Sequence, residues 1–223
     1  MSSGAAGNMT VTHKAETTSP RFDDPLMLIP CTITKLFSLW VSTTYPFESI
    51  GTHLSMHYTT RLSRSVAPGV KLGNFVSLKK DAWLNLWETQ GGPKIIIDDN
   101  CSIGARSIIS AQNLVQLKRD VVVGASVLLQ DHNHAYEDLD RPIRDQGLTP
   151  GGTIRVERGC YIGHGVAIIS PQGELVLGEG CMVLPNSVIL KSMPPHSLVG
   201  GNPARVVEQL NPSQANTESA CAR

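Results

Sequence analysis

Aliphatic residues recur every six positions through most of this chain, and this spacing is its most restrictive feature. A small residue usually stands four places after each leading aliphatic residue. The repeats begin at Val66, Leu72, Leu78, Ile97, Ile103, Leu117, Val123, Val156, Ile162, Leu177, Val183 and Ile189. A period of six matches neither the 3.6-residue helix nor the two-residue alternation of a half-buried strand. It is the period of a hexapeptide-repeat parallel β-helix, so we predict an all-β solenoid.

In such a solenoid each hexapeptide makes one short flat strand and one corner. The leading aliphatic residue should point inward and stack on its equivalents, and the fifth residue should point inward where only a small side chain fits. Glycine at the second place should ease the turn. Three cysteines, Cys101, Cys160 and Cys181, occupy fifth places, so we expect them to be small core residues. The low aromatic content, 5%, agrees with a core built from aliphatic stacks.

Charge and cysteine usage exclude several classes of function. The chain has 19 Lys and Arg against 19 Asp and Glu, so nothing in its net charge favours a nucleic acid partner. The five cysteines are odd in number and contain no C-x-x-C pair, which predicts a reducing, cytoplasmic setting. The apolar stretch from Leu26 to Tyr45 contains Pro30 and Lys35, so we expect no integral membrane span.

The pattern divides the chain into four parts. Residues 1–25 and 208–223 are polar and should be disordered tails. Residues 26–61 should form a cap segment, with a short helix around Thr34–Trp40 covering one end of the solenoid. Residues 62–207 should form the β-helix itself.

Two insertions interrupt the repeat, at Leu86–Lys94 and at about Asp131–Gly152, and repeat proteins place function on insertions. His132 and His134 lie where the second insertion leaves a rung, so the solenoid should hold them in place. A histidine fixed on a rigid edge and backed by a carboxylate such as Asp131 can act as a general base. The alternative for these residue types is a solvated, histidine-rich loop.

Several motifs together resemble a known family. They are the hexapeptide run, the segment Asp131-His132-Asn133-His134 with Tyr136 shortly after it, and the ending Gly200-Gly201-Asn202-Pro203-Ala204-Arg205. Over about residues 62–207 the chain resembles the left-handed β-helix acyltransferases, and more narrowly the sugar O-acetyltransferases related to maltose and galactoside acetyltransferase. The resemblance implies a left-handed solenoid that assembles as a homotrimer. It also implies acetyl-CoA as acyl donor and a sugar or glycoconjugate hydroxyl as small-molecule acceptor.

The resemblance also implies roles for residues around the insertions. A histidine removes the acceptor's proton while the hydroxyl attacks the thioester directly. Matching the family's Gly-His pair onto this chain selects His132, whereas counting without gaps from Val123 selects His134, and both remain candidates. Asp131 would orient the base. Three further residues would contact the acceptor: Asn85, Trp87 and Tyr136.

Four positions match those that border the coenzyme in the family. His164 and Pro185 stand beside the expected path of the pantetheine, where relatives more often carry Ser and Ala. Lys191 and Arg205 lie near the expected phosphates and adenine, and cations there are chemically apt.

Two other functions are compatible with a solenoid of this kind. Some left-handed β-helices are zinc-dependent carbonic anhydrases, and His132, His134 and His164 could supply three nitrogens between subunits. The spacing and the ending of the chain fit that family less well, so we expect no metal. A non-catalytic scaffold is the other alternative, because a solenoid offers a rigid surface for partners.

Overall fold

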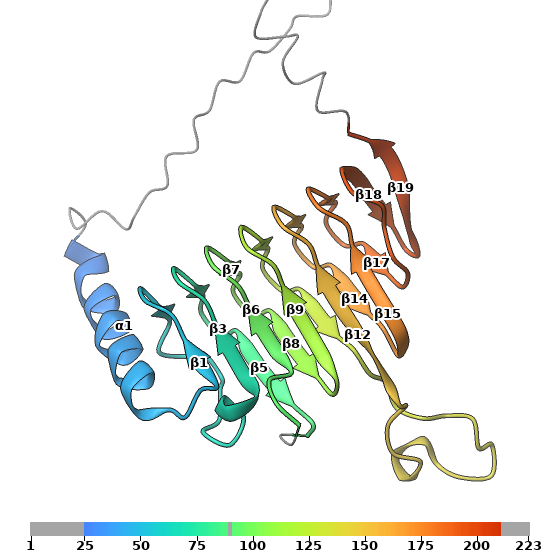
Figure 1. Ribbon diagram of the computed structural model, residues 1–223, viewed down its shortest axis with the longest axis horizontal. Helices are drawn as coiled ribbons and strands as arrows, with labels where there is room; N and C mark the ends of the chain where they lie inside the picture. The colour runs from blue at the N-terminus through green and yellow to red at the C-terminus, as the bar shows by residue number, and fades with distance from the viewer. Residues whose placement is uncertain (1–24, 89–90, 211–223) are drawn as a thin grey trace, which may run out of the picture.

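The computed structural model describes residues 25–88 and 91–210, and short strands in three sheets make up most of it (Figure 1). Sheet A contains, in spatial order, β1 (Ser49–Ile50), β3 (Val70–Leu72), β6 (Ile95–Ile97), β9 (Leu114–Leu117), β12 (Gly151–Val156) and β15 (Gln172–Leu177). Sheet C contains β5 (Trp83–Leu86), β8 (Ile108–Ala111), β11 (Leu128–Gln130), β14 (Ala167–Ile169) and β17 (Val188–Ile189). Strands within these two sheets pair in parallel, as the sequence predicts.

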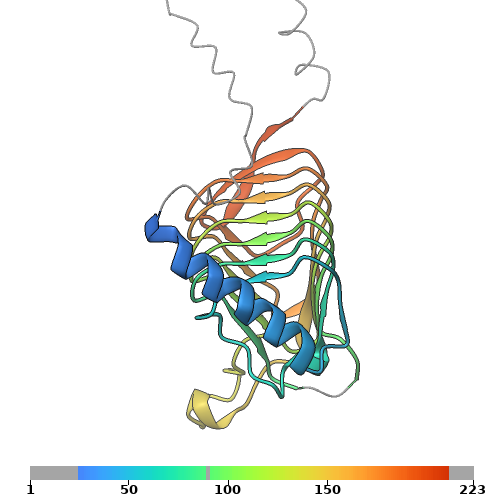
Figure 2. The same cartoon turned by 90° about the vertical axis from the view of Figure 1, so that its left-hand side faces the viewer.

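Sheet B closes the third side of each coil. It contains β2 (Ser55–Met56), β4 (Ser77–Leu78), β7 (Ser102–Ile103), β10 (Val122–Val123), β13 (Tyr161–Ile162), β16 (Met182–Val183), β18 (Ser197–Gly201) and β19 (Ala204–Gln209). Only the pair of β18 and β19 is antiparallel among the described strands. The chain passes from sheet A to B to C and back, so every coil has an A–B, a B–C and a C–A corner (Figure 2).

The inward places of the hexapeptides are occupied as predicted. The leading residues Ile103, Val123 and Ile162 stack in register on sheet B, and all are buried. Fifth-place residues are buried too, including Cys101, Cys160 and Cys181. Burial raises the pKa of the Cys101 thiol to about 11, so the thiol stays protonated and behaves as a small core side chain.

Glycine at the second place has a different cause from the one expected. A Cβ added at Gly104 would lie 2.2 Å from the carbonyl oxygen of Gly124 on the next coil, and Gly124 and Gly163 meet similar backbone contacts. Close stacking of the coils therefore selects glycine there. The backbone turns through the left-handed region at the fourth place instead, as at Asn100 and Gly159.

This distinction predicts different costs for two glycine substitutions. Gly104→Ala forces coils apart and should lower the free energy of unfolding by about 3 kcal/mol. Gly159→Ala is the matched control, because its φ is 70° but nothing lies near the added methyl group, and it should cost only about 1 kcal/mol. Urea unfolding of both variants checks the order, and an equal loss in both would contradict the stacking argument.

The N-terminal helix is longer than the short segment predicted. Helix α1 runs over Pro25–Thr44 and continues through Pro30. Its buried face packs on the first coil through Val41, and the Ser38 hydroxyl accepts a hydrogen bond of 2.8 Å from the Met56 amide. Figure 2 shows the helix lying across the N-terminal end of the stack. Within the described residues, no helix is long and apolar enough to cross a membrane.

The solenoid also extends beyond both expected boundaries. Strand β1 already pairs in parallel with β3, so coiling begins at Ser49 and not at residue 62. At the other end β19 continues through Gln209, which pairs with Ser197 across the hairpin, so residues 208 and 209 are ordered. The rest of the expected tails, 1–24 and 211–223, lies outside the described residues. Two single-turn 3-10 helices, Ala67–Gly69 and Ile143–Asp145, complete the described elements.

Candidate active site

The candidate base and its partner lie at the C–A corner, where the chain leaves β11. Asp131 is fully buried there, and its carboxylate accepts hydrogen bonds from three backbone amides. The amides of Gln112, Asn113 and Leu114, at the same corner of the preceding coil, lie 2.7–2.8 Å from the carboxylate oxygens. These donors hold the charged carboxylate in one orientation inside the protein.

His132 completes this cluster. Its Nδ1 lies 2.9 Å from Oδ1 of Asp131, and the residue is only 3% exposed. Because a carboxylate can only accept, Nδ1 of the ring carries the proton in this contact. The second ring nitrogen, Nε2, is then left with a free lone pair in the neutral imidazole. A carboxylate-oriented imidazole of this kind can remove a proton from a hydroxyl.

Trp87 brings the first insertion to the same corner. Its indole ring meets the His132 ring edge to face, with centroids 5.7 Å apart, and it also contacts the ring of His134 at 6.4 Å. Trp87 is 53% exposed, so its indole ring contacts the buried histidine while much of its surface stays in solvent. The structure therefore brings together four of the predicted residues, Asp131, His132, His134 and Trp87.

The two histidines differ sharply in their surroundings. His134 is exposed, and its ring makes no hydrogen bond within the described chain. Its backbone forms an isolated bridge with Leu148 at the base of the insertion, and its amide donates to the Asn133 side chain. Only His132 has the carboxylate partner that fixes a tautomer.

Asn85 lies on the outer face of sheet C, in strand β5. Its side-chain amide donates a hydrogen bond of 3.1 Å to the Ser110 hydroxyl on the next strand. Gln130 follows in the same row, and its side-chain amide donates to the His132 carbonyl oxygen at 2.9 Å. A polar row that includes Asn85 thus leads along sheet C to the histidine, and acceptor binding by Asn85 stays a prediction.

The second insertion forms an ordered arm that projects from the C–A corner (Figure 1). Its base is fastened by a pair of hydrogen bonds between Asn133 and Thr149, and Gln146 braces the outer turn through three more. Tyr136 lies on this arm and is exposed, and no described hydrogen bond or ring contact joins it to His132. Leu139 at the tip is 95% exposed.

Within one chain, the four residues expected to bind the coenzyme do not lie close to His132. His164 and Pro185 are exposed at the B–C corner, between strands of sheets B and C. Lys191 is exposed at the C–A corner after β17, near the C-terminal end of the stack. Arg205 lies in β19, the outermost strand of sheet B, and donates only to the adjacent Ala204 carbonyl. These four residues therefore lie on more than one side of the solenoid.

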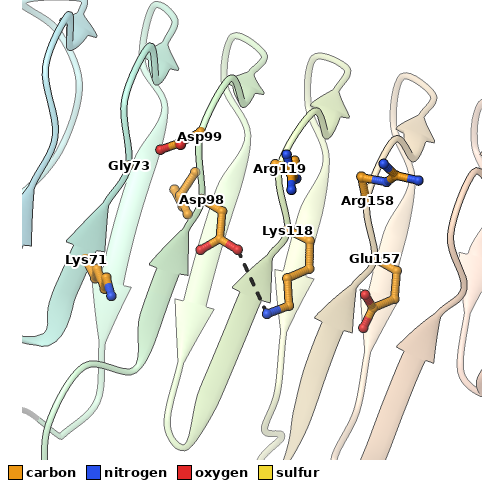
Figure 3. Close-up of a pocket in the computed structure, with 9 residues that line it drawn as sticks. Lys71, Gly73, Asp98, Asp99, Lys118, Arg119, Glu157 and Arg158 are labelled. Carbon is orange, nitrogen blue, oxygen red and sulfur yellow. Dashed lines mark ion pairs between the residues drawn. The ribbon is translucent and has the colours of Figure 1, made fainter.

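A surface hollow lies at the A–B corner, on another side of the coil from the histidines (Figure 3). It measures about 490 Å³ and is lined mainly by charged side chains of alternating sign. The Lys118 ammonium lies 3.9 Å from the Asp98 carboxylate on the adjacent coil, and Arg158 likewise pairs with Glu179 on the coil that follows its own. The hydrogen bond from Arg158 lowers the pKa of Glu179, so that pair persists except in acid. These contacts link successive coils through complementary charges and provide no acid–base pair.

The sequence did not reveal several contacts of the candidate site. The amides of residues 112–114 and the Gln130 side chain form the surroundings of Asp131 and His132. The only sequence signal that could have revealed these backbone donors is the position of Gln112 and Asn113, which end the preceding coil at the equivalent corner. Among the described residues, no three His, Cys, Asp or Glu side chains gather as a metal site. His164, the third nitrogen of the carbonic anhydrase alternative, lies at a different corner from His132.

Comparison with curated proteins finds acetyltransferases, although no family model matches the chain. WbbJ of Escherichia coli, a putative lipopolysaccharide biosynthesis O-acetyl transferase, is 23% identical over 153 residues, which cover 66% of this chain and 73% of WbbJ. A probable acetyltransferase of Mycobacterium tuberculosis is 27% identical over 111 residues, 47% of this chain. That match spans 36% of the relative, or about a third of its length. Serine acetyltransferase 2 of Arabidopsis thaliana is 40% identical over 82 residues, 33% of this chain and 25% of that protein.

Solved structures share the fold. A mutant of AntD, an N-acyltransferase from Bacillus cereus crystallised with dTDP-4-amino-4,6-dideoxyglucose and coenzyme A, superposes with a TM-score of 0.66 at 15% identity, covering 83% of this chain and 95% of AntD. A hexapeptide-repeat acetyltransferase of Vibrio cholerae complexed with acetyl coenzyme A gives 0.53 at 18% identity, covering 85% of this chain and 91% of the other. These likenesses confirm the predicted hexapeptide-repeat fold.

Proposed function

We propose that this chain is an acetyl-CoA-dependent O-acetyltransferase that acts on a hydroxyl of a sugar or glycoconjugate. One observation carries the proposal: a buried Asp131–His132 pair, held by three backbone amides, opens beside Trp87 at the edge of a hexapeptide-repeat solenoid. The curated relatives support acetyl transfer, and WbbJ supports transfer to oxygen. The coenzyme in the solved neighbours supports a CoA thioester as donor.

In the proposed reaction, Nε2 of His132 removes the proton from the acceptor hydroxyl as its oxygen attacks the thioester carbonyl. Asp131 keeps the imidazole in the required tautomer and stabilises it once it is protonated. Collapse of the tetrahedral intermediate breaks the carbon–sulfur bond, and the leaving thiolate takes the proton from His132. The products are the acetyl ester and free coenzyme A. Binding both substrates together at the corner supplies proximity, so no covalent enzyme intermediate is needed.

Asn85 and Trp87 are the proposed acceptor-binding residues. Asn85 lies on the outer face of β5 and donates to Ser110, and Trp87 follows β5 and contacts the His132 ring. An indole wall suits the apolar face of a sugar ring, and an amide suits its hydroxyls. Tyr136 on the projecting arm is proposed to contact the acceptor from the other side.

We further propose that the working form is a homotrimer, with each site shared by two copies. His164 and Pro185 lie at the B–C corner while His132 lies at the C–A corner, so two chains are needed to bring these groups together. The arm, whose Leu139 is exposed, is proposed to reach over a neighbouring copy. Lys191 and Arg205 are proposed to bind the coenzyme's phosphates.

Three buried free cysteines support a reducing, cytoplasmic setting.

A thiol-release assay tests the function. Purified protein with acetyl-CoA is offered a panel of sugars, nucleotide sugars and amino sugars, and free coenzyme A is measured with a thiol reagent. We expect release that depends on a hydroxyl-bearing sugar and yields an ester identified by mass spectrometry. Release accelerated only by amines would contradict O-acetylation, and no release with any acceptor would favour the scaffold alternative.

A further inference from the structure

A second hollow lies on the outer face of sheet C, beside the B–C corner near the N-terminal end. It measures about 410 Å³ and is lined by Arg61, Asp81, Trp83, Arg106 and Ile108. None of these residues has a role in the proposed acetyl transfer.

The two arginines are available to a ligand. The Arg61 guanidinium carbon lies 4.4 Å from the centroid of the Trp83 ring, so the stack fixes the cation without using its N–H groups. Neither Arg61 nor Arg106 has an ion pair among the residues that the structure describes. Asp81 is the only carboxylate lining the hollow, which leaves a surplus of positive charge. Guanidinium groups arranged in this way suit phosphate oxygens.

The strand register sets the spacing of the arginines. Arg61 bridges to Trp83 on the next coil, and Trp83 pairs with Ile108 on the coil after that. Neighbouring strands lie about 4.8 Å apart, so the coils of Arg61 and Arg106 are separated by about 10 Å. The hollow therefore accommodates more than one phosphate group between its two cations.

The same strand connects the hollow with the candidate base. Trp83 and Asn85 are alternate, outward-facing residues of β5, and Trp87 follows at the corner beside His132. At about 3.3 Å per residue, Trp83 and Trp87 lie about 13 Å apart along the chain. A monosaccharide is too short to span that separation, whereas a sugar joined to a nucleoside diphosphate is long enough.

We propose that this hollow binds the diphosphate of a nucleotide-sugar acceptor whose sugar hydroxyl reaches His132. This inference rests on the proposed function and narrows its acceptor class. Arg61 and Arg106 hold the phosphate oxygens at one edge of sheet C, Asn85 lies along the path, and acetyl transfer takes place at the other edge.

Calorimetric titration of the full chain with uridine diphosphate tests the subsite without requiring turnover. We expect the wild type to bind, and Arg61→Gln and Arg106→Gln each to weaken binding about tenfold or more, because each removes charged hydrogen bonds. Arg119→Gln is the matched control: Arg119 is an exposed arginine at the A–B corner, and its loss should leave binding unchanged. Arg106 makes no described side-chain contact, so its variant should fold normally.

Three results would overturn the subsite. They are no binding of uridine diphosphate by the wild type at about 10 mM, well above typical KM values, equal binding by the arginine variants, and displacement of uridine diphosphate by saturating coenzyme A. The last result would assign the phosphates to the coenzyme. Acetylation of a simple sugar in the thiol-release assay is a separate readout. If it persists while uridine diphosphate fails to bind, the subsite is wrong and the proposed function stands.

Discussion

Replacing His132 with alanine should reduce kcat for acetyl transfer by about 10³-fold, the usual contribution of a general base. His132 is the histidine whose Nδ1 lies 2.9 Å from a buried carboxylate, which leaves Nε2 to take the acceptor's proton. Coenzyme A binding should be retained, because no predicted coenzyme contact is removed. Steady-state thiol release and calorimetric titration with coenzyme A measure the two quantities on the same preparation.

His134→Ala is the matched control for this prediction. It removes the same side chain from the same corner, and its ring contact with Trp87 is also lost, but His134 has no carboxylate partner within residues 25–88 and 91–210. We expect only a small change in kcat. If His134→Ala reduces kcat as strongly as His132→Ala, or if His134→Ala alone does so, the assignment of the base is wrong.

Replacing Asp131 with asparagine should have the second largest effect, lowering kcat by about 10²-fold, the lower end of a general base's contribution, and reducing stability as well. An asparagine amide group must face either the Gln112 amide and His132 or the amides of Asn113 and Leu114, which are all donors. Leaving buried donors without an acceptor costs about 1–3 kcal/mol. The His132 ring also loses the acceptor that fixes its tautomer.

Urea unfolding and kcat, measured far below the unfolding midpoint, separate these two consequences. Asp138→Asn removes the same charge from the exposed arm and should change neither quantity appreciably. A folded Asp131→Asn protein with normal kcat would contradict the positioning role, whatever its stability.

The core was predictable because each hexapeptide makes one strand and one corner. Residues six positions apart therefore occupy equivalent inward positions and stack on one another. The first coil was missed although Ile50 and Met56 stand six residues apart. Its fifth places hold Leu54 and Thr60, which hide the usual pattern of small residues. The sequence predicted only a short helix around Thr34–Trp40, whereas α1 runs over Pro25–Thr44, and packing on the first coil outweighs the cost of Pro30 inside it.

The site was predictable where it depends on neighbours in sequence. Asp131 was predicted to orient the base, but the sequence left His132 and His134 open as the base, and the structure shows that the His132 ring meets the carboxylate. The contact between Trp87 and His132 depends on the two residues lying at the same corner of their coils. The sequence predicts this position only if the lengths of both insertions are assigned correctly in the coil register. The amides that hold Asp131 carry no side-chain signature at all, because any residue type presents a backbone N–H.

The antiparallel strand β19 affects how readily further chains can add to the C-terminal end of the solenoid. A stack of parallel strands ends in an unpaired edge, which can recruit further chains and grow into a fibre. Here β19 reverses direction over the last strand of sheet B, and its outer side includes Arg205 and Glu208, which are poor templates for addition. Helix α1 blocks the opposite end. At its C-terminal edge, sheet B is thereby closed by a strand that does not continue the parallel repeat.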